Sequence, residues 1–212
     1  MLATLLAEGF VRQDPVTKSY LAGRRMLELG LSALRNLDVR AAARPEIEAL
    51  RDELEETVHL VILEGTHILF VDSVESGRAV RVGSRTGMKM PAHFTAAGKA
   101  ILAQLPPEAL DEYLDALPPG LTPRSITGRD AIRAEIELTA ERGYATNFEE
   151  SEDGLSAVAA AIPEPSGVVR SSITASLPAG RLPPERAAEI AEAVVRAAQA
   201  VGARLLGALT QV

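Results

Sequence analysis

Between residues 57 and 177, apolar residues recur with the short period of β-strands in several separate stretches. Val58, Leu60 and Ile62 alternate along the first stretch. Turn residues at 64–67 follow, so we expect the first two stretches to pair as a hairpin. The candidate strands are 58–62, 68–74, 79–82, 144–148, 157–162 and 168–177.

Apolar residues at the helical spacing of three and four separate and follow these strands. Gly143 is placed to cap the third of the helices, and Pro183 lies near the start of the last. The candidate helices are 95–105, 106–117, 130–142 and 183–205. Strands that pair as hairpins, with helices grouped between them, indicate an α+β fold with an antiparallel sheet.

The first 22 residues have a pattern of their own. Leu2, Leu5 and Leu6 share one helix face, and Gly9 suits the end of that helix. Residues 10–13 and 18–21, on either side of an Asp-Pro turn, predict a two-stranded hairpin.

A helical connector follows this hairpin. Met26, Leu27, Leu31 and Leu34 form one apolar stripe, and a second helical stretch begins at Asp38 and continues to about Glu56. Pro45 lies inside that stretch, so we expect it to kink the helix or to mark its start. The stripe is equally compatible with core packing and with a contact between subunits.

Composition narrows the class of protein. Hydrophobic residues make up 47% of the 212 residues and charged residues 24%, as in a globular chain. There is no cysteine, which removes disulfides and thiolate metal sites. The chain has neither an apolar run long enough to span a bilayer nor an export signal, so we expect a cytoplasmic protein without a membrane partner.

The net charge of −7 is unevenly distributed. Residues 1–40 carry six basic and four acidic side chains, whereas the remaining residues carry sixteen basic and twenty-five acidic ones. A mildly basic head on an acidic body fits an end that contacts DNA joined to a body that avoids it.

Residues 87–105 carry the most specific candidate chemistry. Thr95 is a plausible N-cap, and the small residues Ala96, Ala97 and Gly98 form the first helical turn. Unpaired N–H groups and the helix dipole make such a turn suitable for a carboxylate, and small side chains allow close approach. The alternative is an ordinary capped helix.

The run Pro-Ala-His-Phe-Thr-Ala-Ala-Gly-Lys-Ala at 91–100 resembles the effector-domain signature of the IclR family of bacterial transcriptional regulators. The family's second signature resembles residues 143–157, and the N-terminal helix and hairpin resemble the last third of a winged helix-turn-helix. The resemblance covers the chain from Leu2. It implies a GAF-like effector domain with about six antiparallel strands at 57–212, a helical linker at 23–56 and a winged-helix remnant at 1–22.

The resemblance also implies a small-molecule pocket. Thr174 and Ser176 are two residues apart on one strand, so both hydroxyls face the same way and can reach one ligand, unless they are hydroxyls satisfied within the sheet. The implied pocket residues are Met88, His93, Thr95, Ala96, Ala97, Gly98, Asn147, Leu155, Ala157, Thr174 and Ser176. Many relatives have a cysteine at Ala157 and an acidic residue at Asn147, and these departures favour an organic acid with an apolar body.

An enzyme is the main rival class. The candidate groups are His59, His67, His93, Lys99, Glu149, Glu150 and Glu152. The sequence has no nucleophile elbow, no phosphate-binding Gly-rich loop and no His-x-x-x-His pair. His59 and His67 could approach each other across the first hairpin, but two histidines rarely hold a metal without a third ligand. We therefore expect no catalytic activity, no metal and no cofactor.

The function predicted from the resemblance is that of a transcriptional regulator. A small organic acid would bind the C-terminal domain and change the arrangement of a homodimer or homotetramer on double-stranded DNA. We expect this chain to lack most of the recognition helix, through truncation or a start codon assigned too late. The alternative is a stand-alone sensor module without DNA binding.

Overall fold

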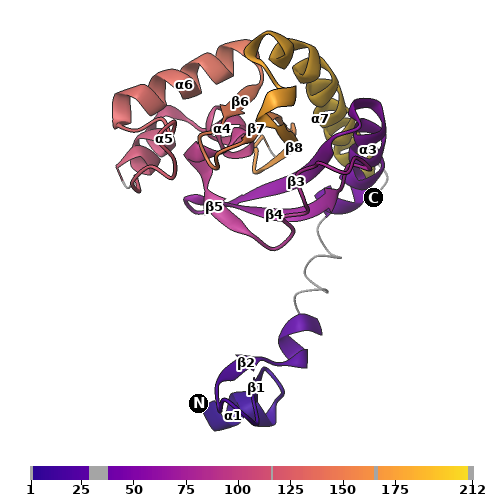
Figure 1. Cartoon of the computed structure of the whole chain (residues 1–212), viewed down its shortest axis with the longest axis vertical. Helices are drawn as coiled ribbons and strands as arrows, with labels where there is room; N and C mark the ends of the chain where they lie inside the picture. The colour runs from indigo at the N-terminus through magenta and orange to yellow at the C-terminus, as the bar shows by residue number, and fades with distance from the viewer. Residues whose placement is uncertain (1, 29–37, 116, 165–166, 210–212) are drawn as a thin grey trace. The chain divides into compact units, whose positions relative to one another are not determined.

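The computed structural model describes residues 2–28, 38–115, 117–164 and 167–209 (Figure 1). The chain divides into two compact units, residues 1–41 and 42–212. The finer division into 1–22, 23–56 and 57–212 stays a prediction.

The first unit contains the predicted helix and hairpin. Helix α1 (Leu2–Ala7) precedes β1 (Val11–Gln13), which pairs antiparallel with β2 (Tyr20–Ala22). The Asp14 carboxylate accepts the backbone N–H groups of Val16 and Thr17, and these bonds close the turn. Of the predicted connector stripe, Met26 and Leu27 are exposed, whereas Leu31 and Leu34 lie outside the described residues.

The second unit is built on a six-stranded antiparallel sheet, which confirms the predicted α+β class. The strand order is β5-β4-β3-β8-β7-β6, so the first long hairpin pairs with the last strand of the chain. The strands are β3 (Thr57–Glu64), β4 (His67–Val74), β5 (Lys89–Pro91), β6 (Ala145–Phe148), β7 (Leu155–Ala161) and β8 (Ser171–Pro178).

Helices cover both faces of this sheet (Figure 1). One face packs on α4 (Ala96–Leu102), with α5 (Pro107–Leu114) and α6 (Arg129–Arg142) beyond it. The opposite face packs on α7 (Ala187–Leu209), which two ion pairs, Glu46–Arg204 and Glu53–Arg196, join to α3 (Asp38–Leu54).

Alternate residues of β8 explain this two-sided packing. Ile173, Ala175 and Leu177 are buried on the α7 side, while Ser172, Thr174 and Ser176 face α4. The hydroxyl-bearing face of β8 therefore lies under the helix whose first turn the sequence singled out.

One local prediction is wrong. Residues 79–82 are not a strand: Val80 is exposed, and its carbonyl accepts the Arg181 guanidinium, so this segment is a loop held by side-chain bonds. The strand that pairs with the outer edge of the β3–β4 hairpin is instead the short β5. Of the two alternatives expected at Pro45, the start of a helix is excluded, because α3 begins at Asp38 and contains this proline.

Candidate functional site

The first turn of α4 is fixed by the residues before it. The Thr95 hydroxyl accepts the N–H of Gly98 at 3.0 Å and donates to the Ala92 carbonyl at 2.9 Å, which confirms Thr95 as the N-cap. A Cβ added to Gly98 would lie 2.1 Å from the Ala92 oxygen. Gly98 is therefore required for packing against the 3₁₀ turn Ala92–Phe94. Ala96 and Ala97 of the same helical turn line a cavity.

A small cavity lies between this turn and the sheet. The space between protein atoms in this cavity, including its opening to solvent, is roughly 310 Å³. The centre of a water molecule can reach only about 20 Å³ of that space. That is room for about one water molecule, so a larger ligand requires side chains at the mouth to move. The lining residues are Phe70, Arg85, Met90, Thr95, Ala96, Ala97, Asn147, Ser151, Leu155, Ala157, Thr174 and Ser176.

Eight of the residues that the sequence assigned to a pocket line this cavity. They come from the start of α4 and from three neighbouring strands, β6, β7 and β8. These eight residues are Thr95, Ala96, Ala97, Asn147, Leu155, Ala157, Thr174 and Ser176.

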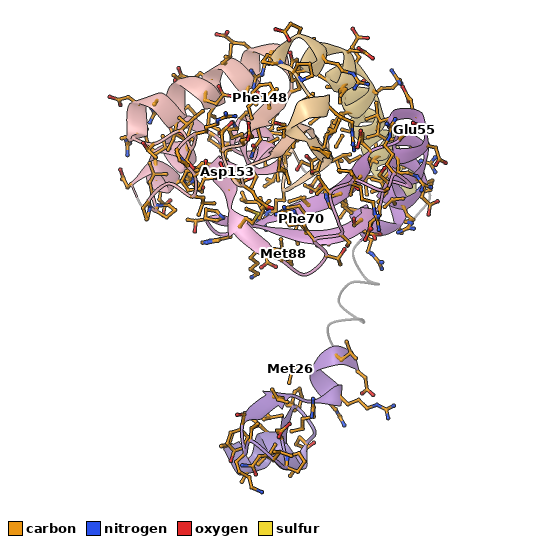
Figure 2. All side chains as sticks on the ribbon, in the orientation of Figure 1. Met26, Glu55, Phe70, Met88, Phe148 and Asp153 are labelled. Atoms are coloured by element: carbon orange, nitrogen blue, oxygen red, sulfur yellow. The ribbon has the colours of Figure 1, made fainter. Side chains whose placement is uncertain are left out.

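The other three predicted residues lie outside the lining. Met88 is 48% exposed, and Figure 2 shows it at the outer margin of the ribbon that leads into β5. The His93 ring is turned to α5, where its Nδ1 lies 2.8 Å from the Tyr113 hydroxyl, and burial lowers its pKa to about 4. Gly98 faces the Ala92 carbonyl, as described above.

The polar side chains that line the cavity differ in whether their hydrogen-bonding groups already have partners within the protein. Asn147 donates to the Phe94 carbonyl and to Ser151, and accepts the Glu150 N–H, so its amide holds the chain around it. The Thr174 hydroxyl donates to the Val158 carbonyl at 3.2 Å. Ser176 has no partner among the described residues, so its hydroxyl is free for a ligand or water.

Sequence reasoning missed Phe70, Arg85, Met90 and Ser151. Ser151 lies inside the second signature. Phe70 is an apolar residue of β4, and Met90 is an apolar residue of β5. Arg85 belongs to the loop between β4 and β5, and no local pattern marks it. Its Nη2 donates to Glu152 at 2.5 Å, and its Nη1 lies 3.6 Å from the Met90 sulfur.

Behind the cavity, Lys99 forms a buried ion pair. Its Nζ donates to both carboxylate oxygens of Glu150, at 2.7 and 2.8 Å, and lies 3.6 Å from Glu135 of α6. The Lys99 side chain is 1% exposed. Burial raises the pKa of Glu150, although the neighbouring ammonium opposes that shift. This pair fixes α4 to the β6–β7 loop.

The remaining candidate groups do not form a catalytic or metal site. His59 and His67 lie toward opposite ends of the β3–β4 hairpin, since His59 pairs with Ser73 and His67 with Glu64, so their predicted approach is wrong. Burial lowers the pKa of His59 to about 3, and neither of its ring nitrogens has a partner among the residues that the structure describes. Within the described part of the chain, no group of three acidic or histidine side chains is placed to hold a metal.

No helix among the described residues is long and apolar enough to cross a membrane.

Comparisons with known proteins give the class of this fold. Residues 31–203 match the family model for the C-terminal domain of the bacterial transcriptional regulator IclR. The solved structure of the Thermotoga maritima IclR superposes with a TM-score of 0.82 at 30% identity, over 96% of this chain and 83% of that one. The fold is therefore that of a regulator's effector domain.

The chain belongs to the IclR family of bacterial transcriptional regulators. It is 29% identical to the regulator KdgR of Escherichia coli over 96% of its own length and 78% of that protein. It spans between 58% and 64% of the next three curated relatives. These relatives are regulators and not enzymes, as the sequence predicted.

An IclR homolog complexed with 4-hydroxybenzoate, from Microbacterium hydrocarbonoxydans, shares the fold. Its TM-score is 0.81 at 24% identity, over 97% of this chain and 83% of that one.

Proposed function

We propose that this chain senses a small organic acid for a DNA-binding regulator, and that the acid binds in the cavity between α4 and the sheet. The observation that carries the proposal is the convergence of Thr95, Ala97, Asn147, Leu155 and Ser176 on one cavity from four separate elements. The Ser176 hydroxyl supplies a hydrogen bond to the ligand, and Ala97 and Leu155 supply an apolar wall, as small-molecule sites require.

The space inside the cavity supports a ligand that enters by displacing side chains. Because the centre of a water molecule can reach only about 20 Å³ of the cavity, an organic acid does not fit until side chains move. A bound acid would hold the side chains and loops around the cavity in a second arrangement. The ligand shifts the equilibrium between the two arrangements only by its difference in affinity for them.

The DNA-binding part of the proposal rests on the family and on the N-terminal unit. The helix α1 and the β1–β2 hairpin support the interpretation of this unit as part of a winged helix-turn-helix. We propose that the regulator acts in the bacterial cytoplasm as a homodimer or homotetramer, because symmetric oligomers read paired DNA half-sites.

Ala97→Leu tests the site. The Ala97 methyl group lines the cavity, so a leucine at this position fills the space that the acid needs. Calorimetric titration should show saturable binding of an acid such as 4-hydroxybenzoate to the unsubstituted chain, and binding at least about tenfold weaker to the variant.

Ala103→Leu is the matched control. Ala103 is the C-cap of the same helix and does not line the cavity, so this variant should bind the acid like the unsubstituted chain. Circular dichroism checks that both variants fold. Equal affinity of all three proteins would place the acid elsewhere.

A further inference from the structure

The loop between β4 and β5 brings one charged side chain into the cavity. Among the described residues of the lining, Arg85 is the one that carries a charge, and the others are apolar or neutral and polar. Its side chain is 13% exposed, so the guanidinium lies largely out of water. A cation in a small, mostly apolar cavity is costly unless an anion accompanies it.

The backbone on both sides of Arg85 is anchored. Glu75 accepts the N–H of Ser84 at 3.1 Å, and Gly87 donates to the Phe70 carbonyl at 2.8 Å. The Met88 N–H donates back to the Arg85 carbonyl at 2.8 Å and closes a tight turn. These bonds hold the residue at the mouth of the cavity before any ligand arrives, which reduces the entropy lost on binding.

The guanidinium still has donors to offer. It carries five N–H groups in a planar fork that matches a carboxylate. Nη2 donates to Glu152, and Nη1 contacts the Met90 sulfur, which is a weak acceptor. In the part of the chain that the structure describes, Nε of Arg85 has no hydrogen-bond partner.

The carboxylate that pairs with Arg85 in this structure is exposed. The Glu152 side chain is 56% exposed and comes from the β6–β7 loop, so the ion pair joins this loop to a residue that lines the cavity. A glutamate that is more than half in water gains little from such a pair. It can be replaced by another carboxylate that is better buried and better aligned.

We propose that Arg85 is the residue that selects for the acid group of the ligand, and that Glu152 occupies its guanidinium until the ligand's carboxylate displaces it. This inference rests on the proposed function, because it assigns the chemistry of that same cavity. The ligand it specifies is a monocarboxylate with a small apolar body. Its carboxylate pairs with Arg85 at the mouth, and its body lies against Phe70, Leu155 and Ala157.

Displacement of Glu152 also changes the contact between two loops beside the cavity. While Arg85 and Glu152 are paired, the β4–β5 and β6–β7 loops are tied together across the mouth. When the ligand takes Arg85, Glu152 is released, while Glu149 and Glu150 of the same loop stay bound to Arg124 and Lys99. The structural change is thereby confined to the outer part of the β6–β7 loop.

Matched pairs of acids and amides separate charge recognition from shape. We would titrate the chain calorimetrically with a panel from pyruvate to benzoate and 4-hydroxybenzoate, each beside its primary amide. The unsubstituted chain should bind the best acid at least about tenfold tighter than its amide. Arg85→Gln should weaken that acid by about tenfold to a hundredfold and leave the amide within about threefold.

Two further variants complete the set. Glu152→Gln removes the competing carboxylate and should tighten the acid several-fold without changing the amide. Arg78→Gln is the control, because Arg78 lies in the same loop, pairs with exposed Glu55 and does not line the cavity. It should leave both affinities unchanged.

Each adverse result has a distinct meaning. If no acid of the panel binds the unsubstituted chain, the proposed function itself fails. If acids bind the unsubstituted chain and Arg85→Gln equally, or if acids and amides bind alike, the assignment of Arg85 is wrong while the site stands. Should Arg85→Gln fail to fold, Glu152→Gln decides, and an acid affinity that is unchanged or lower overturns the inference.

Discussion

Two of the ion pairs that join the β6–β7 loop to the rest of the second unit, Lys99–Glu150 and Arg85–Glu152, use glutamates only two residues apart. Glu150 and Lys99 are almost completely buried, with side-chain exposures of 7% and 1%. Glu152 is 56% exposed, and its partner Arg85 lies at the cavity mouth with an exposure of 13%. Neither partner of the first pair lines the cavity, whereas Arg85 of the second pair does.

The difference in burial indicates different roles for the same chemistry. A buried pair that loses one partner leaves a charge without solvent or counter-charge, so it has to stay intact. A pair with one partner in water contributes little to stability and can exchange partners. We therefore assign Lys99–Glu150 to holding the fold, and Arg85–Glu152 to recognising the ligand.

Lys99→Met should have the largest effect. It leaves the Glu150 carboxylate buried without its ammonium, and this should lower the free energy of unfolding by about 3–5 kcal/mol in urea denaturation. Lys89→Met is the matched control, because Lys89 forms an ion pair with Glu64 on the surface. The Lys89 side chain is 56% exposed and the Glu64 side chain is 42% exposed. That variant should change the free energy of unfolding by less than about 1 kcal/mol. Similar losses in both variants would contradict the structural role of Lys99.

The pH dependence of Lys99→Met sharpens the same contrast. Burial already raises the folded-state pKa of Glu150, and removing Lys99 takes away the charge that opposes this shift. An acid with a raised folded pKa binds its proton more tightly when folded, so lowering the pH from 8 to 5 stabilises the folded state through this group.

The deficit of Lys99→Met relative to the unsubstituted chain should therefore shrink as the pH falls, by at most about 1.4 kcal/mol per pH unit. Urea denaturation at several pH values measures it. A deficit that stays constant or grows toward pH 5 would show that Glu150 is not the group left unpaired.

Ser176→Ala should have the smallest effect, and on affinity only. Its hydroxyl lines the cavity and has no partner in the described part of the chain, so removing it should weaken a bound acid by about 1–2 kcal/mol and leave thermal stability nearly unchanged. Ser172→Ala is the opposite case, because that hydroxyl donates to the Ala97 carbonyl at 3.1 Å. It should lower stability by about 1 kcal/mol without a direct loss of affinity. If the two variants behave alike, Ser176 does not face the ligand.

The fold was largely predictable because its elements carry strong local patterns. The long strands β3, β4, β7 and β8 and the capped helices α4 and α6 were expected near their observed positions. The error at 79–82 has a physical reason: Ala-Val-Arg-Val has strand-like alternation, but side-chain bonds from Thr57 and Arg181 to its carbonyls hold it as a loop. The strand β5 has three residues including Pro91, too few to give a pattern.

The site was predictable where the family signatures supply its residues and unpredictable elsewhere. Thr95, Ala97 and Asn147 lie in those signatures, and all three line the cavity. Arg85 reaches the cavity because the loop around it folds back onto Phe70 and Glu75, a long-range arrangement that leaves no trace in the residues beside it. His93 was misplaced because a signature position does not show which way a ring turns, and here Tyr113 holds it.

The most direct test is a crystal structure of the chain with the tightest-binding acid of the panel. We expect the acid to lie in the cavity between α4 and the sheet, with its carboxylate on the Arg85 guanidinium, its body against Leu155 and Glu152 no longer paired. An acid bound outside this cavity, or inside it with the Arg85–Glu152 pair intact, would show that Arg85 does not select the ligand.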